Sequence, residues 1–256
     1  MDLRDLNIDL DLIQPYLDAH PWPRLFLTMS GGHLYGFASE DSDYDLRGCH
    51  IASAEACLRL RPPRDTYDIL DRDCRIEMDI VTHDAAKYFR MLLGKNGYVL
   101  EQIFSPLIIE AAPEFEELKD IASRCITKHH RHHFRSFASK QWDKVSNAAH
   151  GTVKGLLYTY RPLLAGVHLM RTGKVESNLR VLNEHFELPW IDDLIQAKVE
   201  GGERALLSDA DLDFHNQQFN RLSMILDKAS EESTLPDEPS ASAELDDFLI
   251  RMRLGA

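Results

Sequence analysis

Asp43 and Asp45 are the residues of this 256-residue chain whose types and spacing are best suited to chemistry. They form Asp-Tyr-Asp, and residues two apart on a β-strand point to the same face of a sheet. Two carboxylates on one face supply half of a Mg²⁺ site. A third carboxylate from a neighbouring strand would hold a second ion and accept the proton of an attacking hydroxyl. Asp79 and Glu77 both fit that position, because they share one face of the alternating segment 74–82.

The segment before the aspartate pair predicts a phosphate-binding turn. Leu25–Thr28 is a short apolar run typical of a strand, and Ser30, Gly31 and Gly32 end it with residues that let the backbone approach a ligand closely. Residues 33–37 are then expected to form a short helix or turn whose amides favour an anion. A triphosphate is the obvious candidate.

Each feature has an ordinary explanation, since Ser-Gly-Gly is usually a turn and Asp-x-Asp is usually solvated surface. In this order, however, they resemble the DNA polymerase β-like nucleotidyltransferase superfamily, whose signature is Gly-Gly or Gly-Ser followed by Asp-hydrophobic-Asp. Tyr35-Gly36 and Ser42–Gly48 extend the similarity to the branch found beside RNA ligases in bacterial RNA-repair gene clusters. That branch is expected to carry Gly-Ser at the turn, so a serine hydroxyl is absent at Gly32.

The resemblance also implies a choice of third carboxylate and a set of ligands. Asp79 is preferred to Glu77, because the third aspartate of the relatives lies in an apolar strand just before a helix. The site would bind two Mg²⁺ or Mn²⁺ ions and a nucleoside triphosphate, with ATP as the first choice. Asn96 and Glu101 also match the relatives, but they carry no chemical role here and could simply cap a helix and form an ion pair.

Residues 152–171 predict a helix with one cationic stripe. Lys154, Tyr158 and Arg161 lie at helical spacing on one face, together with His168. Such a stripe is usually solvated, but the resemblance implies a Lys and an Arg seven residues apart that grip the nucleotide. Relatives often carry His where this chain has Tyr158, and Pro162 is expected to kink the helix.

The charge of the chain is unevenly distributed. The net charge is −13, yet residues 124–180 contain eleven Lys and Arg against two acidic residues, a local charge of +9. A basic segment suits an RNA partner, with Arg131, Arg135 and Lys140 as the residues that would follow its backbone. The competing interpretation is that this segment pairs with the acidic C-terminal segment of the same chain.

Four histidines lie close together at the start of this basic segment. His129, His132 and His133 share one helix face, so a metal cluster is geometrically possible. Without an acidic partner, these three and His130 are more often a basic, solvated or phosphate-facing surface.

Composition limits the class of protein. No apolar run approaches about 18 residues, which indicates no membrane partner, and the acidic N-terminus is unlike a signal peptide. We therefore expect a cytoplasmic protein. The four cysteines have neither finger nor Cys-x-x-Cys spacing and are expected to be free thiols.

The predicted fold is α/β (α+β), with a small mixed β-sheet domain at residues 1–112 followed by an all-helical domain at 113–256. The second domain would bind nucleotide and substrate and contain an acidic linker at 230–243, before a short docking helix at 244–253. In the first domain we expect helices at 6–20, 84–93 and 98–104.

These observations predict an enzyme that transfers NMP from an NTP to a hydroxyl, at an RNA end by resemblance, and releases pyrophosphate. The alternatives are antitoxin-like nucleotidyl modification of a partner protein and a catalytically inert nucleotide- or RNA-binding protein. The predicted residues are the catalytic and metal-binding Asp43, Asp45 and Asp79 and the nucleotide-binding Ser30, Gly31, Gly32, Lys154, Tyr158 and Arg161.

Overall fold

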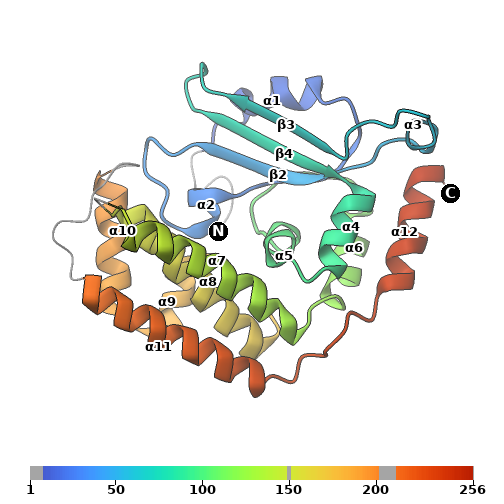
Figure 1. Ribbon diagram of the computed structural model, residues 1–256. Coiled ribbons are helices and arrows are strands. Elements are labelled where there is room, and N and C mark those ends of the chain that lie inside the picture. The colour runs from blue at the N-terminus through green and yellow to red at the C-terminus, as the bar shows by residue number, and fades with distance from the viewer. Residues whose placement is uncertain (1–7, 149–150, 202–211, 256) are drawn as a thin grey trace.

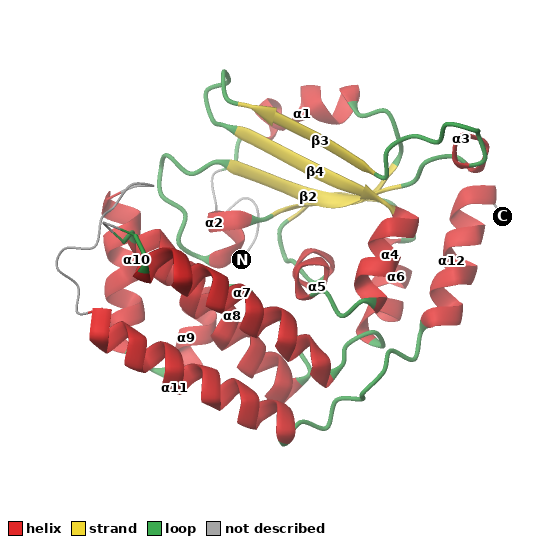
Figure 2. Cartoon of the chain, in the orientation of Figure 1, coloured by secondary structure: helices red, strands yellow, loops and turns green. Residues whose placement is uncertain are grey.

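The structure, a computed structural model, describes residues 8–148, 151–201 and 212–255. It is a mixed α/β fold in which a five-stranded sheet stands beside a layer of long helices (Figures 1 and 2). The predicted fold class is confirmed.

The sheet has the strand order β3-β4-β2-β1-β5. Its central pair, β2 and β4, is parallel, and the other three pairs are antiparallel. The strands are β1 (Arg24–Met29), β2 (Tyr44–His50), β3 (Thr66–Asp71), β4 (Met78–Asp84) and β5 (Ile108–Ala111).

Helices cover both faces of the sheet. His20, which ends α1 (Leu10–Ala19), lies 2.9 Å from the Thr82 hydroxyl on one face. On the other face, Arg47 of β2 donates to the Tyr98 hydroxyl of α5 (Gly97–Ile103) at 2.7 Å. Short helices α2 (Gly31–Tyr35) and α3 (Ala54–Cys57) follow β1 and β2, whereas α4 (Ala85–Leu93) and α6 (Phe115–Ser123) pack near α5 (Figure 1).

The helical layer follows residue 124. The 3-10 turn η2 (Lys128–His130) leads into α7 (Arg131–Ser146), which packs along α8 (Val153–Thr172). Helix α8 runs through Pro162 as one element. The remaining helices are α9 (Leu179–Phe186), α10 (Pro189–Gly201), α11 (Leu212–Glu231) and α12 (Ser242–Leu254).

The local predictions are close to the structure. The helices expected at 84–93 and 98–104 are α4, capped by the Asp84 side chain, and α5. The start at residue 6 of the first predicted helix lies outside the described residues. The strand expected at 74–82 begins only at Met78, because residues 73–76 form bends instead of pairing with β3.

The chain returns to the sheet at its C-terminal end. Helix α12 packs against α4 and α6 (Figure 1), and Arg253 pairs with Asp84 at 2.5 Å. The buried apolar residues before and after residue 112 form one continuous core. The domain boundary at 112 stays a prediction, and the helix expected at 244–253 docks on the first part of the chain.

Phe248 is expected to hold α12 in place. Its side chain is fully buried and lies against Phe89 of α4, with ring centroids 5.8 Å apart, whereas Ile250 is 54% exposed. Phe248→Ala should lower the free energy of unfolding by about 3–5 kcal/mol. Ile250→Ala, on the exposed side of the same helix, should change it by less than about 0.5 kcal/mol. Urea unfolding of both variants checks this, and equal effects would show that α12 is not docked.

Candidate active site

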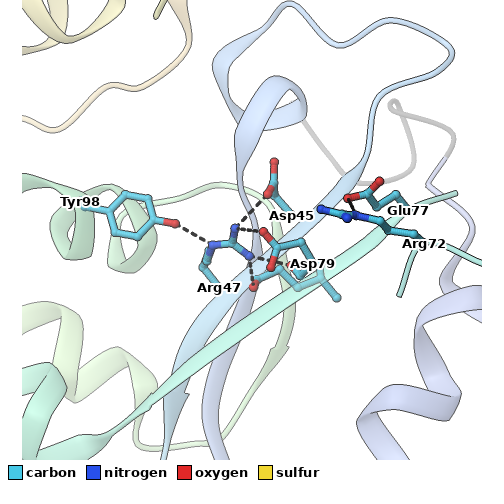
Figure 3. Close-up of polar contacts among 7 residues, drawn as sticks. Asp45, Arg47, Arg72, Glu77, Asp79 and Tyr98 are labelled. Atoms are coloured by element: carbon cyan, nitrogen blue, oxygen red, sulfur yellow. Dashed lines mark hydrogen bonds and ion pairs between the residues drawn. The ribbon is translucent and has the colours of Figure 1, made fainter. Parts of the chain in front are cut away.

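Two aspartates lie side by side at the centre of the sheet. The parallel register of β2 and β4 places Asp45 directly opposite Asp79, so both carboxylates point to the face that α5 covers. Arg47 lies between them and donates through Nη2 to Asp45 Oδ1 at 2.9 Å and to Asp79 Oδ2 at 2.6 Å (Figure 3). Its Nη1 also donates to the Asp79 carbonyl at 2.6 Å, and its Nε donates to the Tyr98 hydroxyl.

This arrangement shifts the pKa values of Asp45 and Arg47. Burial raises the pKa of Asp45; Arg47 opposes that rise, while the nearby Asp79 and Asp43 add to it. Burial alone would lower the pKa of Arg47, but Tyr98 and the two carboxylates outweigh it and raise the pKa. The guanidinium therefore stays charged and offsets two neighbouring negative charges.

Asp43 and Asp45 open onto the same cavity. A cavity of about 510 Å³ between the start of β2 and helices α7 and α8 is lined by both aspartates and, from α8, by Lys154 and Tyr158. Lys144 of α7 also lines it. The expectation that these acids and cations share one site is therefore consistent with their positions.

Gly31 is packed against the Asp45 carboxylate. Its φ is +60°, and a Cβ at this position would lie 2.0 Å from Asp45 Oδ2. Only glycine combines this left-handed backbone with so close an approach. At Gly32 the nearest atom to an added Cβ is the Ala38 Cα at 3.4 Å, so there is room for the serine that the resemblance led us to expect.

A smaller cavity of about 170 Å³ adjoins the first. Asp45 and Tyr158 line both cavities, and the smaller one also contacts Ser30, Gly31 and Arg161. Gly32 lines neither of the two. The structure thus brings seven of the predicted residues around two adjoining cavities, and Asp79 joins them through Arg47.

Arg161 forms a buried ion pair. Its Nη1 donates to Glu101 Oε1 at 2.6 Å, and its guanidinium lies 3.8 Å from the centroid of the Tyr35 ring. Its Nε has no hydrogen-bond partner among the described residues. Arg161 therefore ties α8 to α5. Glu101 forms an ion pair and Asn96 caps α5, the two ordinary roles considered for them.

Glu77, the reserve third carboxylate, lies apart from the site. It precedes β4, and its side chain accepts from Arg72 at 3.4 Å on the far side of Asp79 from Arg47 (Figure 3). Asp79 shares Arg47 with Asp45, whereas the partner of the Glu77 side chain is Arg72. This geometry favours Asp79 as the third carboxylate, which stays a prediction.

The oxygen donors suit a hard divalent cation such as Mg²⁺. Asp43 and Asp45 line one cavity, and burial, together with the neighbouring Asp79 and Asp43, raises the pKa of Asp45, an effect that a bound cation would oppose. Within the described ranges no three His, Cys, Asp or Glu side chains are grouped as a ready-made metal site. The Arg47 guanidinium already engages one oxygen each of Asp45 and Asp79, so a bound ion would share these carboxylates with it.

The histidines play different parts. His130 is fully buried and caps η2 with Thr127, and burial lowers its pKa to about 4. His129 of η2 and His132 and His133 of α7 line another cavity.

Part of the basic segment is paired within the chain. Lys128 contacts Asp237 at 2.8 Å, Arg131 contacts Asp227 at 3.0 Å, and Arg124 contacts Glu244. The interpretation that the basic segment pairs with the acidic C-terminal segment therefore holds for Lys128 and Arg124, whereas Asp227 lies in α11, before that segment. Truncation after Ser230 would remove the acidic partners of Lys128 and Arg124, but it would also remove α12. Point substitutions are therefore the cleaner test of this pairing.

Arg47 and Tyr98 are the site residues that the sequence reasoning missed. Arg47 lies two residues after Asp45, and the alternation that placed Asp43 and Asp45 on one face applies equally to Arg47. Tyr98 carried no comparable signal, because its contact with Arg47 joins residues 51 apart in the sequence.

One family model and two proteins of known sequence match this chain. The family model RlaP, described as the RNA repair pathway DNA polymerase beta family, matches residues 9–251. The chain is 26% identical to the uncharacterized protein MJ0002 of Methanocaldococcus jannaschii, over 86% of this chain and 90% of that protein. It is 23% identical to the uncharacterized protein YcgL of Bacillus subtilis, over 59% of this chain and 58% of that one.

A crystal structure of a nucleotidyltransferase-like protein from Exiguobacterium sibiricum aligns with 95% of this chain and 79% of that one, at 13% identity and a TM-score of 0.31. Within the described residues, no helix has both the length and the apolar character needed to cross a membrane.

The two glycines should respond differently to substitution. Gly31→Ala places a methyl group on the Asp45 carboxylate in a strained backbone, so we expect a loss of about 1–3 kcal/mol in the free energy of unfolding. Gly32→Ala is the matched control and should cost less than about 1 kcal/mol. Thermal or urea unfolding measures both. Similar losses at the two positions would contradict the packing of Gly31 on Asp45.

The Arg161–Glu101 pair should behave as a coupled unit. Glu101→Leu leaves a buried guanidinium without its carboxylate and should destabilise the protein by about 3–5 kcal/mol. The double variant Glu101→Leu/Arg161→Met removes both charges and should be less destabilised than the sum of the single variants. A double-mutant cycle in urea tests this; strictly additive losses would refute the coupling.

Proposed function

Because the chain belongs to the RNA repair pathway DNA polymerase beta family, we propose that it transfers NMP from an NTP, with ATP as the first choice, to the hydroxyl of an RNA end. The observation that carries the proposal is the pairing of Asp45 with Asp79 on parallel strands, beside a cavity that also holds Asp43 and Lys154. Acidic and cationic groups converge there from both sides, as a nucleotide with its charged phosphates requires.

The reaction is an in-line displacement. The acceptor oxygen forms a bond to the α-phosphorus, the bond from that phosphorus to the α–β bridging oxygen breaks, and pyrophosphate leaves with the electron pair. The hydroxyl proton passes to Asp79 as the proposed base. Asp43, Asp45 and Asp79 would hold two Mg²⁺ or Mn²⁺ ions, which when bound neutralise the charge on the triphosphate and favour ionisation of the hydroxyl.

The remaining predicted residues bind and orient the nucleotide. Lys154, which lines the larger cavity, supplies positive charge opposite Asp43 and Asp45, and Tyr158 forms the wall between the two cavities. Arg161 lines the smaller cavity and would contribute its positive charge there. Ser30 and the Gly31-Gly32 turn would contact the phosphates through their backbone, as the family resemblance implies.

Label transfer tests the activity and its dependence on the carboxylates. The protein is incubated with each labelled NTP, Mg²⁺ or Mn²⁺, and separate pools of RNA and protein. Asp43→Asn and Asp45→Asn should each reduce transfer to RNA by orders of magnitude, because each removes a charge from the proposed metal site. Glu77→Gln, which removes a carboxylate from outside both cavities, should leave the rate within about twofold. Near-normal transfer by Asp45→Asn would refute the mechanism.

The same assay separates the roles of Asp79 and Lys154. Asp79→Asn should keep NTP affinity within several-fold and lose turnover, whereas Lys154→Ala should mainly weaken NTP binding. Label in the protein pool would identify protein modification as the function, as in the antitoxin-like alternative. Binding of NTP without transfer to either pool would indicate an inert nucleotide-binding protein.

A further inference from the structure

A third cavity, of about 660 Å³, lies between the α4–α5 connection and the first half of α7. None of the described residues that line it is acidic. Hydrogen-bond donors and cations dominate its wall, namely Lys95, Asn96, His129, His132, His133 and Lys140. Such a lining suits a phosphate group, which needs several donors and positive charge but no competing carboxylate.

Two lysines supply the formal charge of this cavity. Burial, with the nearby charges of Arg161 and Lys140, lowers the pKa of His133 to about 4, and the pKa of His132 is also lowered, first by burial. At neutral pH these two rings therefore donate hydrogen bonds without carrying charge. Lys95 and Lys140 remain as cations, and Lys140 forms no ion pair with any described residue.

Carboxylates of the same chain already bind at the rim of the cavity. Residues 235–240, which we call the acidic strap, cross beside η2, where the Lys128 amide donates to the Pro236 carbonyl at 3.1 Å. Asp237 lies 3.2 Å from His129 Nε2, and Glu238 lies 3.1 Å from Lys95 Nζ. Lys95 and His129 of the cavity wall thus already bind carboxylate oxygens. The acidic strap therefore reduces the attraction of these two residues for an anionic ligand.

The cavity adjoins the candidate active site. His133 and Phe137 line both it and the 170 Å³ cavity that contains Gly31 and Asp45. Helix α5 approaches α7 closely near His133. A Cβ on Gly97 of α5 would lie 2.8 Å from the His133 ring, so glycine permits this approach. The 170 Å³ cavity therefore links the two larger ones, since it shares Asp45 and Tyr158 with the Lys154 cavity and His133 and Phe137 with the donor-lined cavity.

We propose that the 660 Å³ cavity binds a phosphate group of the RNA acceptor strand. This inference rests on the proposed function, in which the acceptor is an RNA end, because the phosphates of an RNA strand need hydrogen-bond donors and positive charge near the reaction site. Glu238 and Asp237 of the acidic strap compete with that phosphate for Lys95 and His129.

Binding of a short labelled oligoribonucleotide, without NTP or divalent metal, tests the proposal by fluorescence anisotropy across a salt series. Lys140→Ala should weaken binding roughly three- to tenfold and lower the log–log salt slope by about 0.7, the value for one phosphate contact of a single strand. Asp237→Asn/Glu238→Gln should have the opposite effect and tighten binding, since it frees Lys95 and His129. The matched control, Lys174→Ala, removes the same charge from an exposed position outside the cavity and should alter neither affinity nor slope.

Several outcomes would overturn the proposal. Equal effects of Lys140→Ala and Lys174→Ala would show a general charge effect, and unchanged or weaker binding by the strap variant would remove the competition. If Lys140→Ala weakens ATP binding and leaves RNA binding unchanged, the cavity holds phosphates of the nucleotide instead. RNA binding by none of the proteins at low salt would favour a protein acceptor.

The test is separate from that of the proposed activity. If the binding pattern holds while label transfer to RNA fails, the phosphate site stands and the proposed function does not. If transfer proceeds but Lys140→Ala leaves RNA affinity and the acceptor KM unchanged, the proposed function stands and this inference fails. Thermal unfolding of each variant checks that its fold is retained.

Discussion

Repulsion between two neighbouring carboxylates is the constraint around which the structure is organised. The parallel pairing of β2 with β4 fixes Asp45 beside Asp79, and a partly buried pair of like charges is costly unless a cation lies between them. Arg47 supplies that cation, and Tyr98 orients it from α5. Tyr98 thus ties α5 to the charged residues of the sheet, and α5 in turn carries Glu101 to the buried guanidinium of α8.

The helices after residue 124 also hold the loop that leads to the first aspartate. Lys198 of α10 is buried and donates to the Ser39 hydroxyl at 2.7 Å. Arg180 of α9 donates to the Gly36 carbonyl at 2.7 Å, and a Cβ on Gly36 would lie 2.3 Å from Asn178. Residues of the helical layer thus hold the backbone that leads to Asp43. Substituting Arg180 of α9 or Lys198 of α10 should therefore shift this loop, although neither residue lines the two cavities of the site.

Local signals predicted the elements well, because strands, caps and turns depend on residues close in sequence. Gly31 and the strand before it are such a case, and the mixed sheet followed from the family resemblance. The contact of Asp45 with Asp79 depends on a register between strands 34 residues apart, which no local pattern contains. The pairing of Arg161 with Glu101 spans 60 residues, so the sequence showed a cation on a stripe and left its partner unassigned.

The charge distribution also depends on contacts between residues far apart in the sequence, which a count of charged residues does not show. Counting residues gives the basic segment a charge of +9, but tertiary contacts offset part of it through Asp227, Asp237 and Glu244. These pairs lie at η2, at the start of α7, and between the end of α6 and α12. Lys140 and Lys144, further along α7, line cavities on the side that faces the sheet and form no ion pair with described residues. Part of the positive charge of the segment therefore lines the cavities on that side, where it would attract the phosphates of the proposed substrates.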